Sequence, residues 1–137
     1  MNNPQPTNGM KIRALLILVV MALSSCDYPV LFGLCKDKIT YGSISPDGKY
    51  IAIVYQRDCG APGGLATFVS IQPSVAKFEG RPKDAIFAVD GPVPVAVSWT
   101  DSSNLRIECI RCSPDKIFKQ KTAWRNIAVS HESYGNH

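Results

Sequence analysis

Beyond residue 36, hydrophobic positions recur at a period of two in short segments of the chain. Leu105, Ile107 and Cys109 alternate with charged side chains, which is the pattern of a strand with one buried face. Residues 49–56 are apolar on both faces, which favours a central strand. In 93–99 the valines alternate with Pro94, which places this strand at a sheet edge or at a strand start. Strands are predicted at 49–56, 65–71, 85–89, 93–99, 105–109, 117–118 and 127–129.

Turn-forming residues separate these segments. Gly, Pro, Asp, Asn and Ser are concentrated at 45–48, 60–64, 90–92, 101–104 and 113–115. The 137 residues are 45% hydrophobic and 19% charged, a globular composition with enough length for one domain. No helical periodicity is found outside the N-terminal apolar run. The expected fold class is therefore all-β: a small antiparallel β-sandwich or curved sheet of about seven strands behind an N-terminal signal helix.

The apolar run covers residues 14–23 and follows Lys11 and Arg13. Ten helical residues rise about 15 Å, half the hydrocarbon thickness of a bilayer, so this run is too short to span one. A basic flank, a short apolar centre and small residues after it are typical of a secretory signal peptide. Met10 directly precedes the segment and is an alternative start.

The run ends in Leu23-Ser24-Ser25-Cys26, which resembles the lipobox of bacterial lipoproteins. The resemblance implies cleavage before Cys26, a diacylglycerol thioether on its sulfur and acylation of the new amino terminus. Several acyl chains anchor a protein stably where one does not. The implied location is a Gram-negative envelope, facing the periplasm. Asp27 resembles a signal for the inner membrane, with the outer membrane as the alternative. An ordinary secreted protein with Cys26 in a disulfide is the competing interpretation.

These features divide the chain into four parts. We expect a signal peptide at 1–25, a lipidated cysteine and tether at 26–36, a β domain at 37–129 and a mobile tail at 130–137. The tail is predicted because its residues show no apolar pattern. The apolar stretch within 27–36 is interpreted as a tether or as the first edge of the core.

Three segments of the β domain are similar to a family of small bacterial envelope proteins of unknown activity. They are Ser45-Pro46-Asp47-Gly48-Lys49, Arg57-Asp58-Cys59-Gly60-Ala61 and Thr67-Phe68-Val69-Ser70-Ile71, where the family has SPDGK, an RDCGATTG-like turn and a T-x-V-S-I strand. The likeness extends more loosely through Trp99 toward residue 129, and a family cysteine before SPDGK matches Cys35. The sequence departs at 62–64, where Pro-Gly-Gly replaces threonines. The resemblance implies a β fold and no particular activity. Segments 45–52 and 98–105 also look like β-propeller strand entries, but the chain is too short for a closed ring.

If Cys26 carries lipid, four cysteines remain, and an exported domain of this size favours disulfides among them. Of the three pairings that four cysteines allow, we favour Cys35 with Cys59, which joins the strand before SPDGK to the hairpin loop. Cys109 and Cys112 have the C-x-x-C spacing of redox enzymes, which need an exposed cysteine at a helix N-terminus. Here the motif ends a strand. A structural disulfide, within the pair or to the other two cysteines, is preferred over free thiols or redox catalysis.

Other chemistry lacks suitable residues. Cys109, Cys112, His131 and His137 give C-x2-C-x18-H-x5-H, but the central gap is longer than in zinc fingers, so no metal and no cofactor are expected. A Ser–His–Asp arrangement has only these two terminal histidines. The glycine stretch 60–64 could bind an anion, but a turn between strands explains it better. Two carboxylate pairs, Asp47 with Asp58 and Asp84 with Asp90, could approach in space, but aspartates are common in β-turns and turns explain them better. Trp99 and Trp124 are predicted to be core or rim aromatics.

The charge balance favours neither nucleic acid nor acidic surfaces as partners. Past the signal, thirteen Lys and Arg residues face eleven Asp and Glu residues. We therefore expect a noncatalytic periplasmic protein that is anchored in the membrane through lipid on Cys26 and binds a partner protein. An immunity or exclusion role is one form of this function. The alternatives are a redox protein that uses Cys109 and Cys112, and a structural accessory of an envelope complex.

Overall fold

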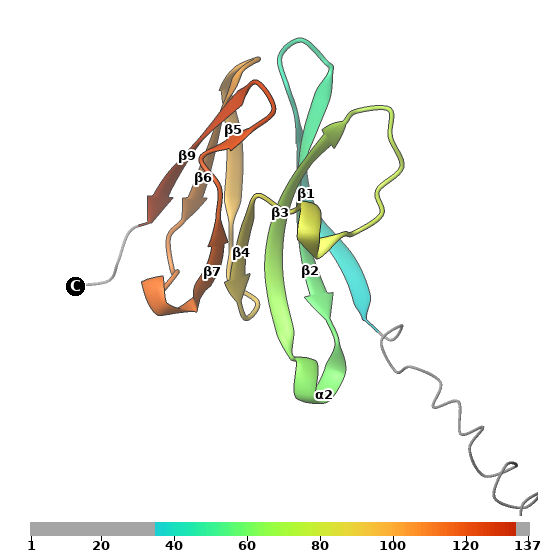
Figure 1. Cartoon of the computed structure of the whole chain (residues 1–137), viewed down its shortest axis with the longest axis vertical. Coiled ribbons are helices and arrows are strands. Elements are labelled where there is room, and N and C mark those ends of the chain that lie inside the picture. Colours follow the sequence, from blue (N-terminus) through green and yellow to red (C-terminus); the bar gives the residue numbers. More distant parts are fainter. Residues whose placement is uncertain (1–34, 134–137) are drawn as a thin grey trace, which may run out of the picture. The chain divides into compact units, whose positions relative to one another are not determined.

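The strands form two sheets that pack on a shared core (Figure 1). The structure is a computed structural model that describes residues 35–133, so the predicted signal peptide, Cys26 and nearly all of the tether lie outside the described residues. The first sheet has the order β1 (Lys36–Ile44), β2 (Tyr50–Asp58), β3 (Leu65–Pro73), β4 (Phe87–Asp90) and β7 (Ile117–Gln120). The second has the order β5 (Ala96–Asp101), β6 (Asn104–Cys109), β9 (Ile127–Ser133) and β8 (Ala123–Trp124). Short helical turns are α2 (Gly60–Gly63), η2 (Pro82–Asp84) and η3 (Pro114–Lys116).

β2 and β3 bury side chains on both faces, which was predicted for β2 from the apolar residues on both of its faces. On the face toward the second sheet, Val54 belongs to the same core cluster as Leu105 and Ile107. On the opposite face, Tyr55 stacks on Phe68 with 5.3 Å between ring centroids, and Phe78 from the following loop packs against Tyr55. The first sheet is therefore covered on both sides at its centre.

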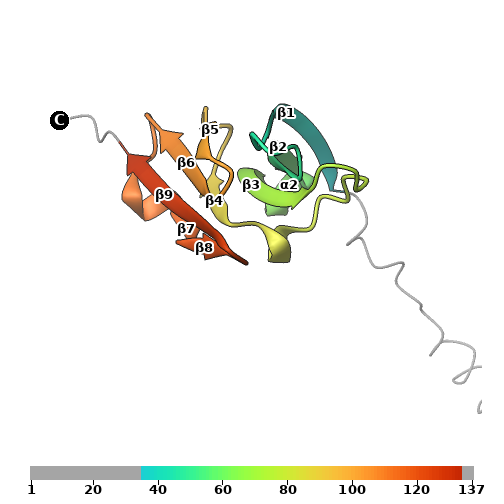
Figure 2. The same cartoon turned by 90° about the horizontal axis from the view of Figure 1, so that it is seen from above.

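The chain crosses between the sheets three times after β4. It enters the second sheet for β5 and β6, returns for β7 and crosses again for β8 and β9. As a result, the edge strands β1 and β5 lie on one side of the domain, and β7 and β8 lie on the other (Figure 2). The side with β1 and β5 is the one that carries the candidate site.

The all-β fold class is confirmed, with nine strands in the described residues. All neighbouring pairs are antiparallel except β6 and β9, which run parallel with Ile107 opposite His131. This exception to the antiparallel prediction has a simple cause. β7, β8 and their connections separate β6 from β9, and a connection of this length allows a parallel return that a tight hairpin forbids.

Three boundary predictions need correction. Residues 130–133, predicted as the start of a mobile tail, belong to β9 and pair with residues 106–109 of β6. The pattern missed them because main-chain pairing needs no apolar side chains. The strand predicted at 93–99 begins only at Ala96, since Pro92 and Pro94 have no N–H for a ladder. Lys36, assigned to the tether, is the first residue of β1.

Candidate functional site

An apolar groove of about 510 Å³ lies on the side of the domain formed by β1 and β5. One wall contains Thr40 and Tyr41 of β1, and the other is segment 92–97, which leads into β5. Gln56, Glu108 and Ile110 complete the lining. Its volume lies in the range of small-ligand sites. Tyr41 is 51% exposed and Ile110 is 56% exposed, so two large apolar side chains lie open to solvent at the groove.

A β-bulge in β1 directs Tyr41 toward the groove. Ile39 lies opposite Tyr55 and Tyr41 lies opposite Val54, so Thr40 is left over between them. Opposed residues share a sheet face, and Tyr41 therefore shares the face of Val54, which looks toward the second sheet. The Thr40 hydroxyl donates a hydrogen bond of 3.2 Å to the Val54 carbonyl and holds the bulge. Bulges at sheet edges commonly redirect a side chain in this way.

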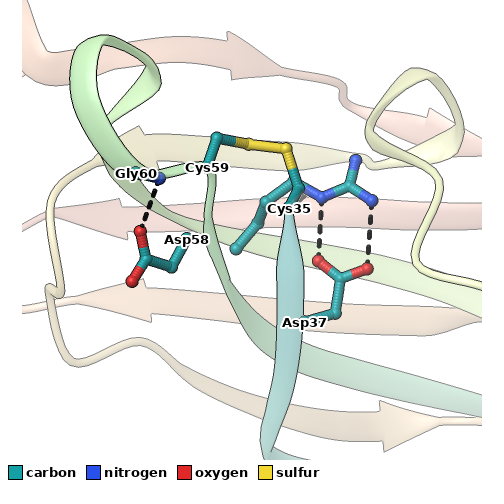
Figure 3. Close-up of a disulfide and its surroundings, with 6 residues drawn as sticks. Cys35, Asp37, Asp58, Cys59 and Gly60 are labelled. Atoms are coloured by element: carbon teal, nitrogen blue, oxygen red, sulfur yellow. Dashed lines mark hydrogen bonds and ion pairs between the residues drawn. A yellow bond between two sulfur atoms is a disulfide. The ribbon is translucent and has the colours of Figure 1, made fainter. Parts of the chain in front are cut away.

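The start of β1 is held by specific bonds, because the strand is exposed along nearly its whole length. Cys35 forms a disulfide with Cys59, just past the end of β2, which is the pairing favoured from the sequence. Asp37 accepts two hydrogen bonds from Arg57, of 2.8 Å from Nε and 3.0 Å from a terminal nitrogen (Figure 3). The disulfide and the ion pair together attach the first residues of this wall to β2.

The opposite wall is attached to β3 at its beginning. Gly91, with a φ of 89°, donates its N–H to the Leu65 carbonyl at 2.8 Å. The Gly91 carbonyl accepts a second bond of 2.8 Å from the Thr67 hydroxyl. Pro92 and Pro94 follow, so between 92 and 95 this wall has main-chain donors only at its two valines. The wall is apolar and poor in hydrogen-bond donors.

The disulfide between Cys109 and Cys112 closes the turn that follows β6 and carries Ile110. The two cysteines are buried, with exposed fractions of 2% and 3%. Thiol–disulfide exchange requires a thiolate to reach one of the sulfurs, and redox cysteines lie exposed at a helix N-terminus. The end of β6 provides neither condition. This is the environment of a structural disulfide within the pair, one of the arrangements that the sequence left open.

Trp99 connects the two sheets on the side of the domain that carries the groove. Its indole Nε1 donates a hydrogen bond of 2.9 Å to the Ser43 carbonyl and so links β5 to β1 across the two sheet edges. Trp99 and Trp124 both pack partly buried against the core, as predicted. Trp124 meets Tyr50 edge to face, with 5.4 Å between centroids.

The aspartates that could have formed catalytic pairs have local partners instead. Asp47 accepts a 2.6 Å hydrogen bond from the Ser45 hydroxyl and a 3.2 Å bond from the Lys49 N–H. These bonds, the hydroxyl bond first, hold the pKa of Asp47 below its usual value. The others are also engaged: Asp58 with the Gly60 N–H, Asp84 with Arg81 and Asp90 with Lys116. These are turn and surface roles.

The glycine stretch 60–64 forms a turn closed by its own main chain. Cys59 donates its N–H to the Gly64 carbonyl at 3.0 Å, and Gly64 donates to the Gly60 carbonyl at 2.6 Å. The turn connects β2 to β3, as predicted, rather than preceding a long helix that would bind an anion.

His131 has a structural environment in β9. Its Nε2 donates to the Lys121 carbonyl at 2.6 Å, and its ring stacks on Phe87 with 5.7 Å between centroids. Its Nδ1 is buried without a hydrogen-bond partner among the described residues. Residues 35–133 contain no group of three or more His, Cys, Asp or Glu side chains placed to hold a metal ion. His137 lies outside the described residues.

Comparison with known proteins assigns no relative. No family model, curated protein or solved structure matches this chain. Within residues 35–133, no helix has both the length and the apolar character needed to cross a membrane. Cys26, the predicted lipidation residue, lies outside the described residues.

Sequence reasoning did not identify the groove. Tyr41 and Ile110 are isolated apolar residues between polar or cysteine neighbours, and their exposure becomes known only once the sheets are assembled. The one local signal was the Pro-Val-Pro-Val stretch at 92–95, whose alternation predicts a strand but whose prolines prevent regular pairing.

Proposed function

We propose that this protein is a lipid-anchored, noncatalytic binding protein of the periplasm, and that it holds a partner protein in the groove between β1 and segment 92–97. The proposal is carried by the groove itself, whose lining includes the exposed side chains of Tyr41 and Ile110. Exposed apolar patches on small proteins mark interaction sites, and aromatic side chains dominate binding energies there.

The disulfides support a binding role because they order the walls before a partner arrives. Cys35–Cys59 holds the start of β1, and Cys109–Cys112 holds the turn that carries Ile110. A preorganised surface loses less conformational entropy on binding than a flexible one. The buried position of the second disulfide also makes a structural role a better account of it than redox catalysis.

The lipid anchor would place this groove near the membrane. Cys35 lies nine positions after Cys26, and an extended chain of that length spans at most about 30 Å. A tether of this length raises the effective concentration of the domain for partners in or on the same membrane. Asp27 favours the inner membrane as that location.

The anchor is tested with a Cys26→Ala variant expressed beside the parent protein. We expect the parent to fractionate with membranes and its N-terminal peptide to show the mass of an acylated cysteine. The variant should keep its leader and lack the acyl mass. An unmodified thiol on Cys26 of the parent would overturn the anchoring proposal.

The groove is tested by photo-crosslinking in living cells. A benzoylphenylalanine replaces Ile110 in one strain and Val75, a 96% exposed residue of another loop, in the control strain. We expect a discrete protein adduct from position 110 and none of that mass from position 75. Equal adducts from both positions, or none from 110, would contradict a binding groove. A mixed disulfide formed through Cys109 in a Cys112→Ala variant would instead support the redox alternative.

A further inference from the structure

The free edge of β1 presents main-chain groups to the groove. Within residues 35–133, β1 pairs with β2 alone. The Tyr50 carbonyl of β2 accepts from the Ser45 N–H of β1, so by alternation Val54 also faces β1, whereas Tyr55 faces β3. Tyr41 lies opposite Val54, so its main-chain groups point to β2. Ile39 lies opposite Tyr55, so its main-chain groups point to the free edge, as do those of Asp37 two residues before it. The free edge is therefore open at Asp37 and Ile39.

The two walls of the groove differ in what they can bond. β1 offers a strand edge, whereas Pro92 and Pro94 deprive the opposite wall of regular donors. An extended chain in the groove would make main-chain hydrogen bonds to β1 and place side chains against Val93, Val95 and Ile110. Addition of a strand to an exposed sheet edge is a common mode of peptide recognition.

Two lysines give the open edge a positive charge. Lys38 lies opposite Gln56, a groove residue, and Lys36 lies two positions before it on the same face. Both lysine side chains are exposed, and within residues 35–133 neither side chain makes a hydrogen bond or ion pair. The acidic residue of the groove, Glu108, lies on the second sheet and pairs with Arg106 at 3.5 Å. A carboxylate on the bound chain would therefore be attracted to the β1 side.

The same lysines make a second copy of this chain a poor occupant. Antiparallel pairing of two β1 strands about Lys38 would set one Lys38 opposite the other. Parallel pairing in register would place both lysines beside their counterparts. Like charges directly opposed across strands destabilise the pairing. The charge pattern therefore selects a different chain, one with acidic residues.

We infer that the groove receives an extended segment of another protein, which pairs with the free edge of β1 and carries acidic residues beside Lys36 and Lys38. This inference rests on the proposed binding function and specifies the form and chemistry of the partner segment. Apolar residues at alternate positions of the segment lie toward Tyr41 and the valines of the opposite wall.

The test uses three synthetic peptides and the full-length protein in lipid nanodiscs. The first peptide alternates Val and Thr over five residues and ends in two Glu residues. The second has Lys in place of both Glu residues, and the third is the acidic peptide with alternate main-chain nitrogens methylated. Affinity is measured by fluorescence polarisation, and hydrogen exchange reports the Ile39 amide.

We expect the acidic peptide to bind about tenfold more tightly than the lysine peptide, because two attractive cross-strand pairs replace two repulsive ones. The methylated peptide should lose at least about tenfold in affinity, since it cannot complete the ladder. Exchange of the Ile39 amide should slow only with the acidic peptide. Lys38→Glu should reverse the peptide preference, whereas Lys77→Glu, at an exposed lysine of another loop, should leave it unchanged.

Three results would overturn the inference. They are equal binding of the methylated peptide, absence of binding by the acidic peptide at about 1 mM, and sedimentation that shows a dimer paired through β1. An Ile110 crosslink in cells combined with any of these results would leave the binding groove in place and remove only the strand-pairing mechanism. Loss of the crosslink would remove the groove itself.

Discussion

Replacing Cys35 and Cys59 by alanine removes the covalent link at the start of β1. The two cysteines are 24 residues apart. In the chain-entropy model, a disulfide closing a loop of this length stabilises the folded state by about 3.5 kcal/mol. For a domain of this size, that loss lowers the melting temperature by roughly 15 to 25 °C. Few buried contacts compensate, because β1 is exposed on both faces.

The second disulfide provides an internal comparison. Cys109 and Cys112 are only 3 residues apart, so the same model assigns their link about 2 kcal/mol. The Cys35→Ala/Cys59→Ala variant should therefore be less stable than the Cys109→Ala/Cys112→Ala variant by roughly 1.5 kcal/mol. The second pair is the more deeply buried of the two, so burial alone would predict the opposite order of stability. The expected order therefore tests the dependence on loop length.

Urea unfolding followed by circular dichroism without reductant measures both losses. Amide hydrogen exchange shows where the first one acts. In the Cys35→Ala/Cys59→Ala variant, we expect the amides of residues 36–41 to lose protection from exchange. The amides of β6 should keep their protection. A loss of stability below about 1 kcal/mol, with unchanged exchange in β1, would refute the idea that this disulfide holds the groove wall.

Three further outcomes follow from single contacts. Burial raises the pKa of Tyr55 to about 12 from 10.0, so this side chain ionises first in the unfolded chain. The free energy of unfolding therefore falls as pH rises between these two values, by up to roughly 2 to 3 kcal/mol. Unfolding measured from about pH 9 to 12 should show this decline in the parent protein and not in Tyr55→Phe. The pKa of Asp47 is lowered, so stability should be lost as pH falls below 3.8, and acid unfolding should show less of this loss in Asp47→Ala. Trp99→Phe removes the bond to Ser43 and should cost about 1 kcal/mol in urea unfolding, with faster exchange at the end of β1. Unchanged exchange there would show that this bond does not hold β1 against β5.

The strands that bury side chains were predictable from local pattern. β2, β3 and β6 each bury apolar residues at the positions where the sequence places them, because burial imposes a period of two on one face or an unbroken apolar run on both. The turn at Ser45 to Gly48 was equally predictable, since it is built from local hydrogen bonds. These features depend on residues close in sequence.

The groove was not predictable because its walls come from distant segments. Residues 40–41 and 92–97 are about fifty positions apart, and only the crossing from β4 to β5 brings them to the same side. β1 follows no burial pattern, since its side chains are exposed on both faces. The disulfide between Cys35 and Cys59 was the one long-range link that the sequence suggested, because four cysteines allow only three pairings.

An edge strand with exposed apolar residues is a risk for self-association, and β1 exposes Ile39, Tyr41 and Ile44. Lysines and bulges are the usual protections of such edges, and β1 has both, at Lys36, Lys38 and Thr40. Neither protection covers the outward-facing main-chain groups of Asp37 and Ile39. The charge that prevents two β1 strands from pairing is also the charge that an acidic segment would neutralise. Selectivity for an acidic partner and resistance to self-pairing should therefore change together. Lys36→Thr/Lys38→Thr is expected to weaken the preference for the acidic peptide and to produce dimers in sedimentation, and a change in only one of these properties would separate the two roles.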